Sequence, residues 1–314
     1  MTVAAFDIGS HTVTMVVMSP DGTVLESRVA VSALARGLEA TGELALDAIE
    51  RVAATLSFGR EAAERHRATT IVATITEAGR RASNTDALLA AIAQRLGVAG
   101  TVIDPDTEAQ LSWRGAFEGR HVPPSGELRG LIDIGGGSTE IALGTNTDKP
   151  DSTRSMPFGS ARLTATELHH DPPLPAELTN AIGLAFDHTD DVAREIPRIG
   201  DVTQWVGVAG TIVTVAAVEI GLISWDEGAV DGFRLTRSAA EDVFRTLATE
   251  SRADRAHNPG LPADRVDVIV GGCCALVAIM RRLQLDEITV STRGLAHGLA
   301  RMTLETIDRS RAAE

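Results

Sequence analysis

The sequence predicts an α/β protein built from two similar halves. Apolar, β-rich runs alternate with amphipathic helical stretches in each half, which is typical of α/β domains. One motif also occurs twice, as Asp-Ile-Gly-Ser at 7–10 and as Asp-Ile-Gly-Gly-Gly-Ser at 133–138. A chain of 314 residues is long enough for two domains. We therefore expect a duplicated domain, with residues 1–124 forming the N-terminal copy and residues 125–314 the C-terminal copy.

The first half is expected to contain five strands and three long helices. Apolar runs predict the strands, and apolar residues at helical spacing between charges predict the helices. We expect strands at 3–10, 12–18, 23–29, 69–76 and 98–103, and helices at 44–65, 84–96 and 107–117. Gly97 would end the second of these helices, and the Pro- and Gly-containing segment 119–126 is the expected linker.

The second half is expected to repeat this plan. Its first two strands form a hairpin over 131–143, followed by a polar loop at 144–153. Further strands are expected at 205–209, 266–270 and 288–291. Helices are expected at 161–169 and 175–196, from 210 to 220, at 238–250, from 271 to about 285, and over the last twenty or so residues.

Composition and charge exclude several protein classes. The net charge of −14 disfavours nucleic acids and acidic membranes as partners, so a polyanionic substrate needs a local basic patch or a metal ion. The adjacent Cys273 and Cys274 form no disulfide framework and are expected in the core. No signal peptide is evident, and the longest apolar run, 268–280, is too short to cross a bilayer. A cytoplasmic location is therefore expected.

The glycine turn at 135–137 has the features of a phosphate site. Three glycines without Cβ atoms let backbone N–H groups approach an anion. Asp133 precedes the turn and Glu140 follows it, and two carboxylates suit a phosphate only if a divalent cation lies between them. The alternative is an ordinary hairpin. Similar turns follow expected strands at Gly9-Ser10, at 207–211 and at Gly271-Gly272, which favours a phosphate-binding function.

Several motifs along nearly the whole chain resemble one known family. They are Asp-Ile-Gly-Ser at 7–10, Thr-Glu-Ala at 107–109, Asp-Ile-Gly-Gly-Gly-Ser-Thr-Glu at 133–140, Phe-Gly-Ser-Ala-Arg-Leu at 158–163, Gly-Val-Ala-Gly-Thr at 207–211, Pro-Gly-Leu at 259–261, Arg-Val-Asp at 265–267 and Ser-Thr-Arg-Gly-Leu at 291–295. The set resembles the exopolyphosphatase and guanosine pentaphosphate phosphohydrolase (Ppx/GppA) family. The resemblance implies two ribonuclease H-like domains of the actin and sugar-kinase superfamily, with phosphoanhydride hydrolysis in the cleft between them.

The resemblance also assigns roles to individual residues. Glu108 matches the glutamate that orients and deprotonates the attacking water, a role that competes with an ordinary solvated position in the first turn of a helix. Asp133 and Glu140 would hold magnesium, and Glu140 also counts as catalytic. The phosphate-binding candidates are Asp7, Gly9, Ser10, His11, Arg80, Gly135, Gly136, Gly137, Ser138, Gly210 and Thr211. The sequence does not decide between Arg80 and Arg81.

Some positions depart from the family pattern and bear on rate and affinity. They are His11, Thr14, Asp231, Ala296 and His297.

Three functions stay open: a hydrolase of inorganic polyphosphate, with short chains expected because the chain lacks further helical domains; a guanosine pentaphosphate hydrolase; and a sensor with weak turnover. Kinase acceptor motifs are not apparent. The apolar C-terminal helices allow a homodimer. His169 and His170 lack a third ligand at metal-site spacing and are expected at the surface.

Overall fold

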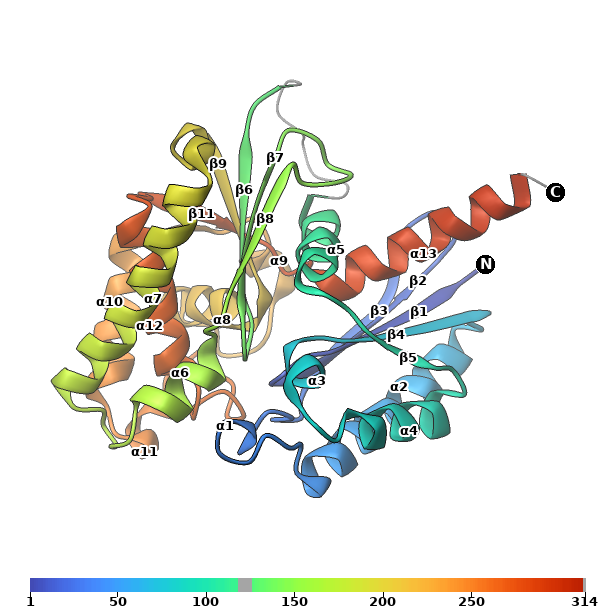
Figure 1. Ribbon diagram of the computed structural model, residues 1–314, viewed down its shortest axis with the longest axis horizontal. Coiled ribbons are helices and arrows are strands. Elements are labelled where there is room, and N and C mark those ends of the chain that lie inside the picture. Colours follow the sequence, from blue (N-terminus) through green and yellow to red (C-terminus); the bar gives the residue numbers. More distant parts are fainter. Residues whose placement is uncertain (118–125, 313–314) are drawn as a thin grey trace. The chain divides into compact units, whose positions relative to one another are not determined.

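The computed structural model describes residues 1–117 and 126–312, and these form two compact units (Figure 1). Within the described residues, unit 1 comprises 1–117 with 293–312, and unit 2 comprises 126–292. The expected domain boundary at 124/125, and all of the expected linker except Gly126, lie outside the described residues. One expectation needs correction: residues from Arg293 onward pack with the N-terminal unit, although the sequence placed all of 125–314 in a C-terminal domain.

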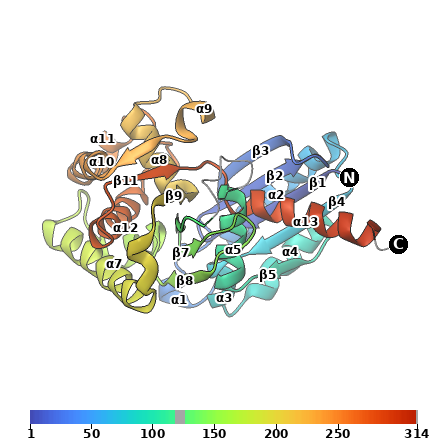
Figure 2. The ribbon, with the colours of Figure 1, turned by 90° about the horizontal axis from the view of Figure 1, so that it is seen from above.

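Unit 1 is built on a five-stranded mixed sheet in the order β3-β2-β1-β4-β5 (Figure 2). Its strands are β1 (Val3–Ile8), β2 (Thr12–Met18), β3 (Val24–Val31), β4 (Thr70–Ile75) and β5 (Gly100–Val102). Its longer helices are α2 (Leu46–Arg65), α4 (Thr85–Leu96), α5 (Pro105–Phe117) and α13 (Leu295–Ala312). Alternate residues of β1 face opposite sides of the sheet. Ala4, Phe6 and Ile8 pack in one core with α2 and α4, whereas Val3 and Ala5 pack in another with α13.

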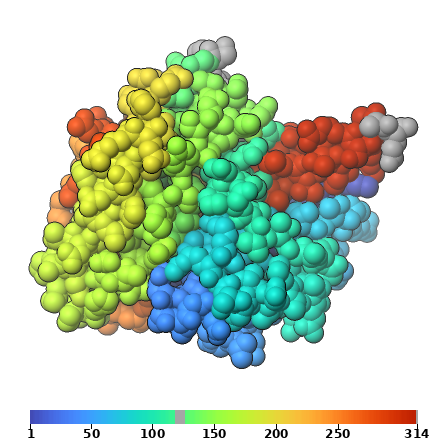
Figure 3. Space-filling view, in the orientation of Figure 1, coloured from blue at the N-terminus to red at the C-terminus, as the bar shows by residue number. Residues whose placement is uncertain are grey.

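Unit 2 is built on a six-stranded sheet in the order β10-β11-β9-β6-β7-β8. Its strands are β6 (Arg129–Ile134), β7 (Thr139–Gly144), β8 (Ser152–Met156), β9 (Gln204–Val208), β10 (Arg234–Thr236) and β11 (Glu287–Val290). Its longer helices are α6 (Ser160–Glu167), α7 (Pro175–Glu195), α8 (Ala209–Ile220), α10 (Arg237–Thr249) and α12 (Ile269–Arg282). α12 packs against the other four, and α7 lies along the outer surface of the unit (Figure 3).

The two sheets share one topology, which confirms the predicted duplicated α/β fold. In each unit the first strand lies at the centre, antiparallel to the second and parallel to the fourth. The parallel side is continued by the fifth strand, β5, in unit 1 and by the sixth strand, β11, in unit 2. β10 is an antiparallel addition at the edge of unit 2. The short remaining elements are α1 (Leu38–Thr41), α3 (Glu77–Arg81), η1 (Pro197–Asp201), α9 (Glu227–Val230) and α11 (Arg252–Arg255).

Two expectations for unit 2 are wrong. Residues 266–270 form no strand, and Gly271 and Gly272 lie inside α12 rather than in a turn. All of residues 269–280 are buried, so the apolar run has no polar face that could separate a helix from a strand. A Cβ on Gly271 would lie 2.5 Å from the Thr164 hydroxyl, so these glycines let α12 approach α6. The expected polar loop at 144–153 also ends in β8, an edge strand with few apolar residues.

The helices α5 and α13 meet through two glycines. A Cβ on Gly115 of α5 would overlap the carbonyl oxygen of Gly294, and a Cβ on Gly298 of α13 would overlap that of Leu111. The two backbones therefore touch, and this contact explains why the C-terminal helix packs in unit 1. Among the described residues, no helix has the length and apolar character needed to cross a membrane.

Gly115→Ala should destabilise the protein by about 1–3 kcal/mol, because the added methyl group has to separate two touching backbones. Gly183→Ala in α7 is the matched control, since a Cβ there meets nothing within 4 Å. That change should stabilise by about 0.5–1 kcal/mol, as expected for replacing glycine inside a helix. Urea unfolding of both variants measures the two effects, and equal stabilities would contradict the close contact between α5 and α13.

Glu177 organises the start of α7. Its carboxylate accepts hydrogen bonds from His170 Nδ1 at 2.7 Å, from the Leu174 amide at 2.9 Å and from the His169 amide at 3.1 Å. The hydrogen bond from His170 is the largest cause that lowers the pKa of Glu177 from 4.5 to about 2. The two histidines therefore take part in a helix cap, and the His170 side chain is largely exposed, as expected.

Glu177→Gln should lower the melting temperature by a few degrees at pH 7. Since the pKa of Glu177 is lower in the folded protein than in the unfolded chain, its stabilisation is complete above about pH 4.5 and disappears as the pH falls toward about 2. The difference between wild type and variant should therefore shrink over this range in thermal denaturation. A difference independent of pH would show that the carboxylate charge is not what stabilises the cap.

Candidate active site

Asp133 and Glu140 are buried carboxylates on neighbouring strands. These strands, β6 and β7, form the hairpin labelled in Figure 1. The two acids are partners in the antiparallel register, and such partners project from the same face of a sheet. Their exposed fractions are 8% and 1%. Glu140 Oε1 also accepts a hydrogen bond of 2.7 Å from the Ser155 hydroxyl on β8. The hairpin thus holds two acids side by side, with the glycine loop 135–138 joining their strands.

The glycine loop is bound to the start of α6 through its carbonyl groups. Gly135 accepts a bond of 2.9 Å from the Ser160 amide, and Gly136 accepts bonds of 2.9 and 3.0 Å from the next two amides. These contacts use the N-terminal amides of α6, so that helix end is not an anion site. The amides of Gly136, Gly137 and Ser138 donate to no other group among residues 1–117 and 126–312. They are therefore available to a phosphate oxygen.

Gly159 is required for this contact. A Cβ at this position would lie 2.7 Å from the Gly135 carbonyl oxygen and 2.7 Å from the Gly136 carbonyl group. The Phe-Gly-Ser-Ala-Arg-Leu motif at 158–163 therefore acts through the glycine loop, which it holds in place.

A second anion-binding feature lies beside this hairpin in unit 2. β9 pairs with β6 so that Val208 is the partner of Asp133, and α8 begins at the next residue, Ala209. Ala209 has a φ of 67°, and this left-handed residue followed by helix directs successive amides to one side. Gly210 and Thr211 thus lie in the first turn of α8, at the same edge of the sheet as Asp133.

The guanidinium of Arg265 lies directly against Gly210. A Cβ on Gly210 would overlap this group, and burial lowers the pKa of Arg265. Within the described residues, Arg265 forms no hydrogen bond or ion pair. A partly buried arginine that forms no hydrogen bond to an anion is unfavourable in a protein alone, so its position at a helix N-terminus indicates an anionic ligand. The sequence marked the Arg-Val-Asp motif without giving Arg265 this role.

In unit 1 the first glycine turn joins β1 and β2. The Gly9 amide donates to the Thr12 carbonyl at 2.8 Å, and the Ser10 hydroxyl donates to Glu77 Oε2 at 2.9 Å. His11 is buried, with an exposed fraction of 6%. Sequence patterns did not indicate Glu77, whose carboxylate accepts the hydrogen bond of the Ser10 hydroxyl. That hydroxyl was expected to bind phosphate. Asp7 lies on β1 just before this turn.

Glu108 lies in the first turn of α5 and contacts Arg80. Arg80 donates to Glu108 Oε2 at 2.6 Å and to the Ile103 carbonyl at 2.9 Å. Asp104 caps the helix by accepting a bond of 2.7 Å from the Thr107 amide, and these amide and hydroxyl contacts with Thr107 lower the pKa of Asp104. Glu108 is 7% exposed, so it is not the solvated helix residue of the alternative interpretation.

The two arginines left open by the sequence have different neighbours. Arg81 bonds to Glu39 and Glu77, which raise its pKa. Arg80 is therefore the arginine next to Glu108. Since β1, β4 and β5 are parallel where they pair, the turn at Gly9, α3 and the start of α5 follow strand ends at one edge of the unit 1 sheet.

Most residues that depart from the family pattern take part in hydrogen bonds or core packing of the fold. Asp231 accepts a bond of 2.9 Å from the Thr292 amide and joins α9 to the end of β11. Ala296 packs in the core that contains Val3 and Ala5. The ring of His297 is buried and accepts from the Gly294 amide at 3.4 Å. Thr14 lies within β2, opposite Asp7.

Comparison with known proteins identifies the family. The model of the Ppx/GppA phosphatase family matches residues 16–306. The chain belongs to this family. Exopolyphosphatase 2 of Mycobacterium tuberculosis is 30% identical over 314 residues, which cover 95% of this chain and 97% of that protein.

Solved structures agree with this assignment. An exopolyphosphatase-like protein superposes with a TM-score of 0.91 at 26% identity, covering 98% of this chain and 100% of the other. The Ppx/GppA family member of Aquifex aeolicus gives 0.78 at 27% identity, with 98% of both chains covered. As a member of the family, the chain is a hydrolase that acts on phosphoanhydrides.

The residues present fit a magnesium ion, which the family resemblance implies. Magnesium is usually bound by one or two carboxylates together with water and substrate phosphates. Asp133 and Glu140 supply two such carboxylates next to free amides. Among the described residues, no group of three or more His, Cys, Asp or Glu side chains forms a complete metal cage. The hairpin therefore suits an ion that is completed by a phosphate.

Gly159→Ala should release the glycine loop from α6. The added methyl group displaces the carbonyls of Gly135 and Gly136, so the Ser160 and Ala161 amides lose their acceptors. We expect hydrogen exchange at these amides at least about tenfold faster than in wild type. Gly200→Ala, where a Cβ meets nothing within 4 Å, should leave their exchange unchanged. Unaltered exchange in Gly159→Ala would show that the contact does not restrain the loop.

Proposed function

We propose that the protein is a magnesium-dependent exopolyphosphatase that releases the terminal phosphate of inorganic polyphosphate, with short chains as the first substrate to test. The observation that carries this proposal is the anion-binding arrangement of unit 2. It combines free amides at 136–138, the N-terminus of α8 and the unpaired guanidinium of Arg265, all at one edge of the sheet. The name of the mycobacterial relative supports polyphosphate as the anion.

The glycine loop and α8 bind phosphate groups of the chain in this proposal. Backbone amides and a helix N-terminus bind any phosphate, which suits a polymer of identical units. Arg265 supplies the full positive charge that the amides lack, and a guanidinium binds two phosphate oxygens at once. Gly9, Ser10 and His11 are proposed to contribute in the same way from unit 1.

Glu108 acts as the general base in this proposal. The contact with Arg80 fixes the orientation of the carboxylate. Glu108 takes a proton from water as the water oxygen bonds to the terminal phosphorus. The bond from that phosphorus to the bridging oxygen breaks, and the shortened chain leaves as an anion.

Asp133 and Glu140 would hold the magnesium ion. When bound, the ion neutralises negative charge on the phosphate oxygens, which offsets the repulsion between the substrate and these two acids. Ser155 orients Glu140 by donating to Oε1, so the carboxylate keeps one geometry.

Guanosine pentaphosphate is the competing substrate, because it carries the same terminal anhydride. A binding protein with weak turnover is the other alternative. Phosphate release from short polyphosphate, long polyphosphate and guanosine pentaphosphate at equal concentration separates the first two. Calorimetry with the same ligands identifies a sensor by tight binding without release.

Glu108→Gln and Glu140→Gln should each lower kcat for phosphate release by about 10²–10⁴, the usual contribution of general acid–base catalysis or of a charge-stabilising group. The isosteric amide keeps shape and removes charge. Glu195→Gln is the matched control, since Glu195 lies at the exposed end of α7 and pairs only with Arg154 among its described neighbours. Wild-type rates in both site variants would make the proposed mechanism wrong.

Arg265→Met should weaken the use of polyphosphate without lowering the stability of the protein. Loss of the guanidinium should lower kcat/KM for polyphosphate by about 10–100-fold, because charge-assisted hydrogen bonds to phosphate are lost. The melting temperature should stay equal or rise, since the variant no longer has a partly buried charge without a hydrogen-bonded partner. A large fall in melting temperature together with unchanged kcat/KM would assign Arg265 a structural role instead.

A further inference from the structure

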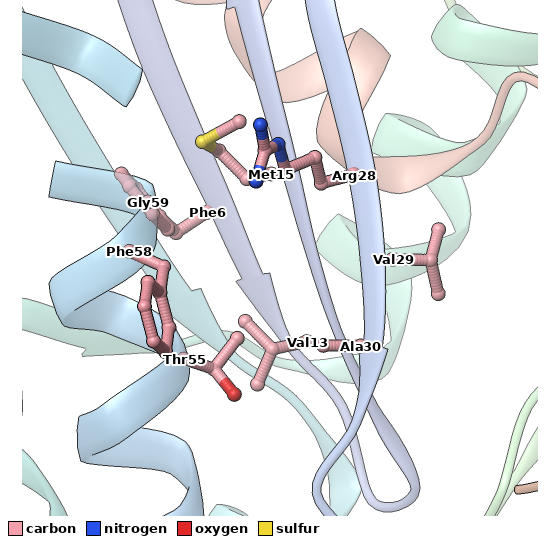
Figure 4. A pocket seen from close by; sticks show the side chains of 9 residues that line it. All are labelled: Phe6, Val13, Met15, Arg28, Val29, Ala30, Thr55, Phe58 and Gly59. Atoms are coloured by element: carbon pink, nitrogen blue, oxygen red, sulfur yellow. The ribbon is translucent and has the colours of Figure 1, made fainter. Parts of the chain in front are cut away.

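A second surface of unit 1 is unrelated to the phosphate-binding turns. A cavity of about 420 Å³ lies between α2 and the outer strands β2 and β3 (Figure 4). It is lined by Phe6, Val13, Met15, Arg28, Val29, Ala30, Thr55, Phe58 and Gly59. Thr55 and Phe58 of α2 face Val13 and Ala30 across the cavity, whereas Val29 points away from it (Figure 4).

The cavity opens where apolar side chains are exposed. Phe58, which lines the cavity, is 64% exposed, and Val29, which points to the other face of β3, is 57% exposed. The backbone of α2 touches the sheet at Gly59, where a Cβ would overlap the ring of Phe6. The hollow beside this contact is thus walled by α2 on one side and by strands of the sheet on the other.

β3 is the edge strand of this sheet, so half of its backbone groups have no partner strand. The Ser32 amide donates a hydrogen bond to the His11 carbonyl. In an antiparallel pair every second residue bonds to the partner strand, so Ala30 and Arg28 also direct their N–H and C=O groups toward β2. The N–H and C=O groups of Ser27 and Val29 therefore point away from β2. Both residues are exposed, so an added strand can reach these groups.

The charge beside the cavity is positive. Arg28 is the charged residue among the nine that line it, and its side chain is 57% exposed. Glu26 is the neighbouring acid, and it is already contacted by Arg28 at 2.5 Å, His66 at 2.8 Å and Arg65 at 3.1 Å. One carboxylate thus faces at least two positive charges in a chain whose net charge is −14. An acidic ligand group complements this edge.

We propose that β3 and α2 form a docking groove for an extended peptide of a partner protein. The peptide adds as a sixth strand to β3, bonding to the backbone of Ser27 and Val29. Residues two apart on a strand share a face, so the peptide places an acidic side chain beside Arg28 and an apolar side chain beside Ala30, in the hollow under Phe58. The recognised sequence therefore has an acidic and an apolar residue separated by one position.

The test uses labelled seven-residue peptides and the full chain. The two probes are Thr-Val-Asp-Val-Leu-Val-Thr and the reversed order Thr-Val-Leu-Val-Asp-Val-Thr, which cover both strand directions. Control peptides replace Asp by Lys or Leu by Ser. Fluorescence anisotropy should give a Kd on the order of 10–100 µM for one probe and at least about tenfold weaker binding for its controls. Hydrogen exchange at the Ser27 and Val29 amides should slow in the complex.

Three variants locate the site. Phe58→Ala removes an exposed wall of the cavity, and Val29→Pro removes an outward N–H that the sheet does not use. Each should weaken binding at least about tenfold. Arg28→Glu should reverse the preference, so that the Lys peptide binds more tightly than the Asp peptide. Phe186→Ala, which changes a partly exposed phenylalanine on α7, should leave binding unchanged.

Three results would overturn the proposal. No binding of either probe at 1 mM, or binding that Phe58→Ala and Val29→Pro leave unaltered, excludes a peptide groove at this edge. Sedimentation that shows a dimer of the wild type and a monomer of Val29→Pro identifies a second copy as the occupant of β3. Wild-type phosphate release in all three variants is expected, so this test is independent of the proposed function.

Discussion

The hydrogen bonds from α6 to the carbonyls of Gly135 and Gly136 are the constraint on which the candidate site depends. They hold the glycine loop with its carbonyl side against protein, so its amide side is left for a ligand. The same loop sets the hairpin register that pairs Asp133 with Glu140. Glycine at 159 is the structural requirement, because a side chain there would occupy the space of the two carbonyls. The contact between α6 and the glycine loop thus fixes the position of the loop, the direction of its amides and the pairing of the two carboxylates.

The two units use one sheet topology for different tasks. In unit 2 the turn after the first strand is a three-glycine loop between acids, and the fourth strand leads into α8 below Arg265. In unit 1 the corresponding turn is shorter, and its Ser10 hydroxyl is bonded to Glu77. The fifth strand of unit 1 instead leads to Glu108 and its contact with Arg80. Unit 2 thus carries the glycine loop, the paired acids and Arg265, whereas unit 1 carries Glu108 and Arg80.

Local patterns predicted the parts of the structure that depend on local sequence. The β6–β7 hairpin was predictable because apolar strands flank glycines, and the end of α4 because Gly97 adopts a positive φ of 72°. Long-range packing was not predictable. α12 is apolar on every side, so its sequence fits a strand equally well, and α13 joins unit 1 through glycine contacts that no periodicity reveals. Arg265 was missed for the same reason: its position over Gly210 arises only in the folded chain.

The most direct test of the central claim is ³¹P NMR of polyphosphate hydrolysis in water enriched in ¹⁸O, with and without magnesium. Water attack on the terminal phosphorus predicts release of single orthophosphate ions that carry the ¹⁸O isotope shift, shortening of the chains by one unit at a time, and dependence on magnesium. Internal cleavage of the chains, transfer of phosphate to an acceptor, or no orthophosphate release at all would contradict the account.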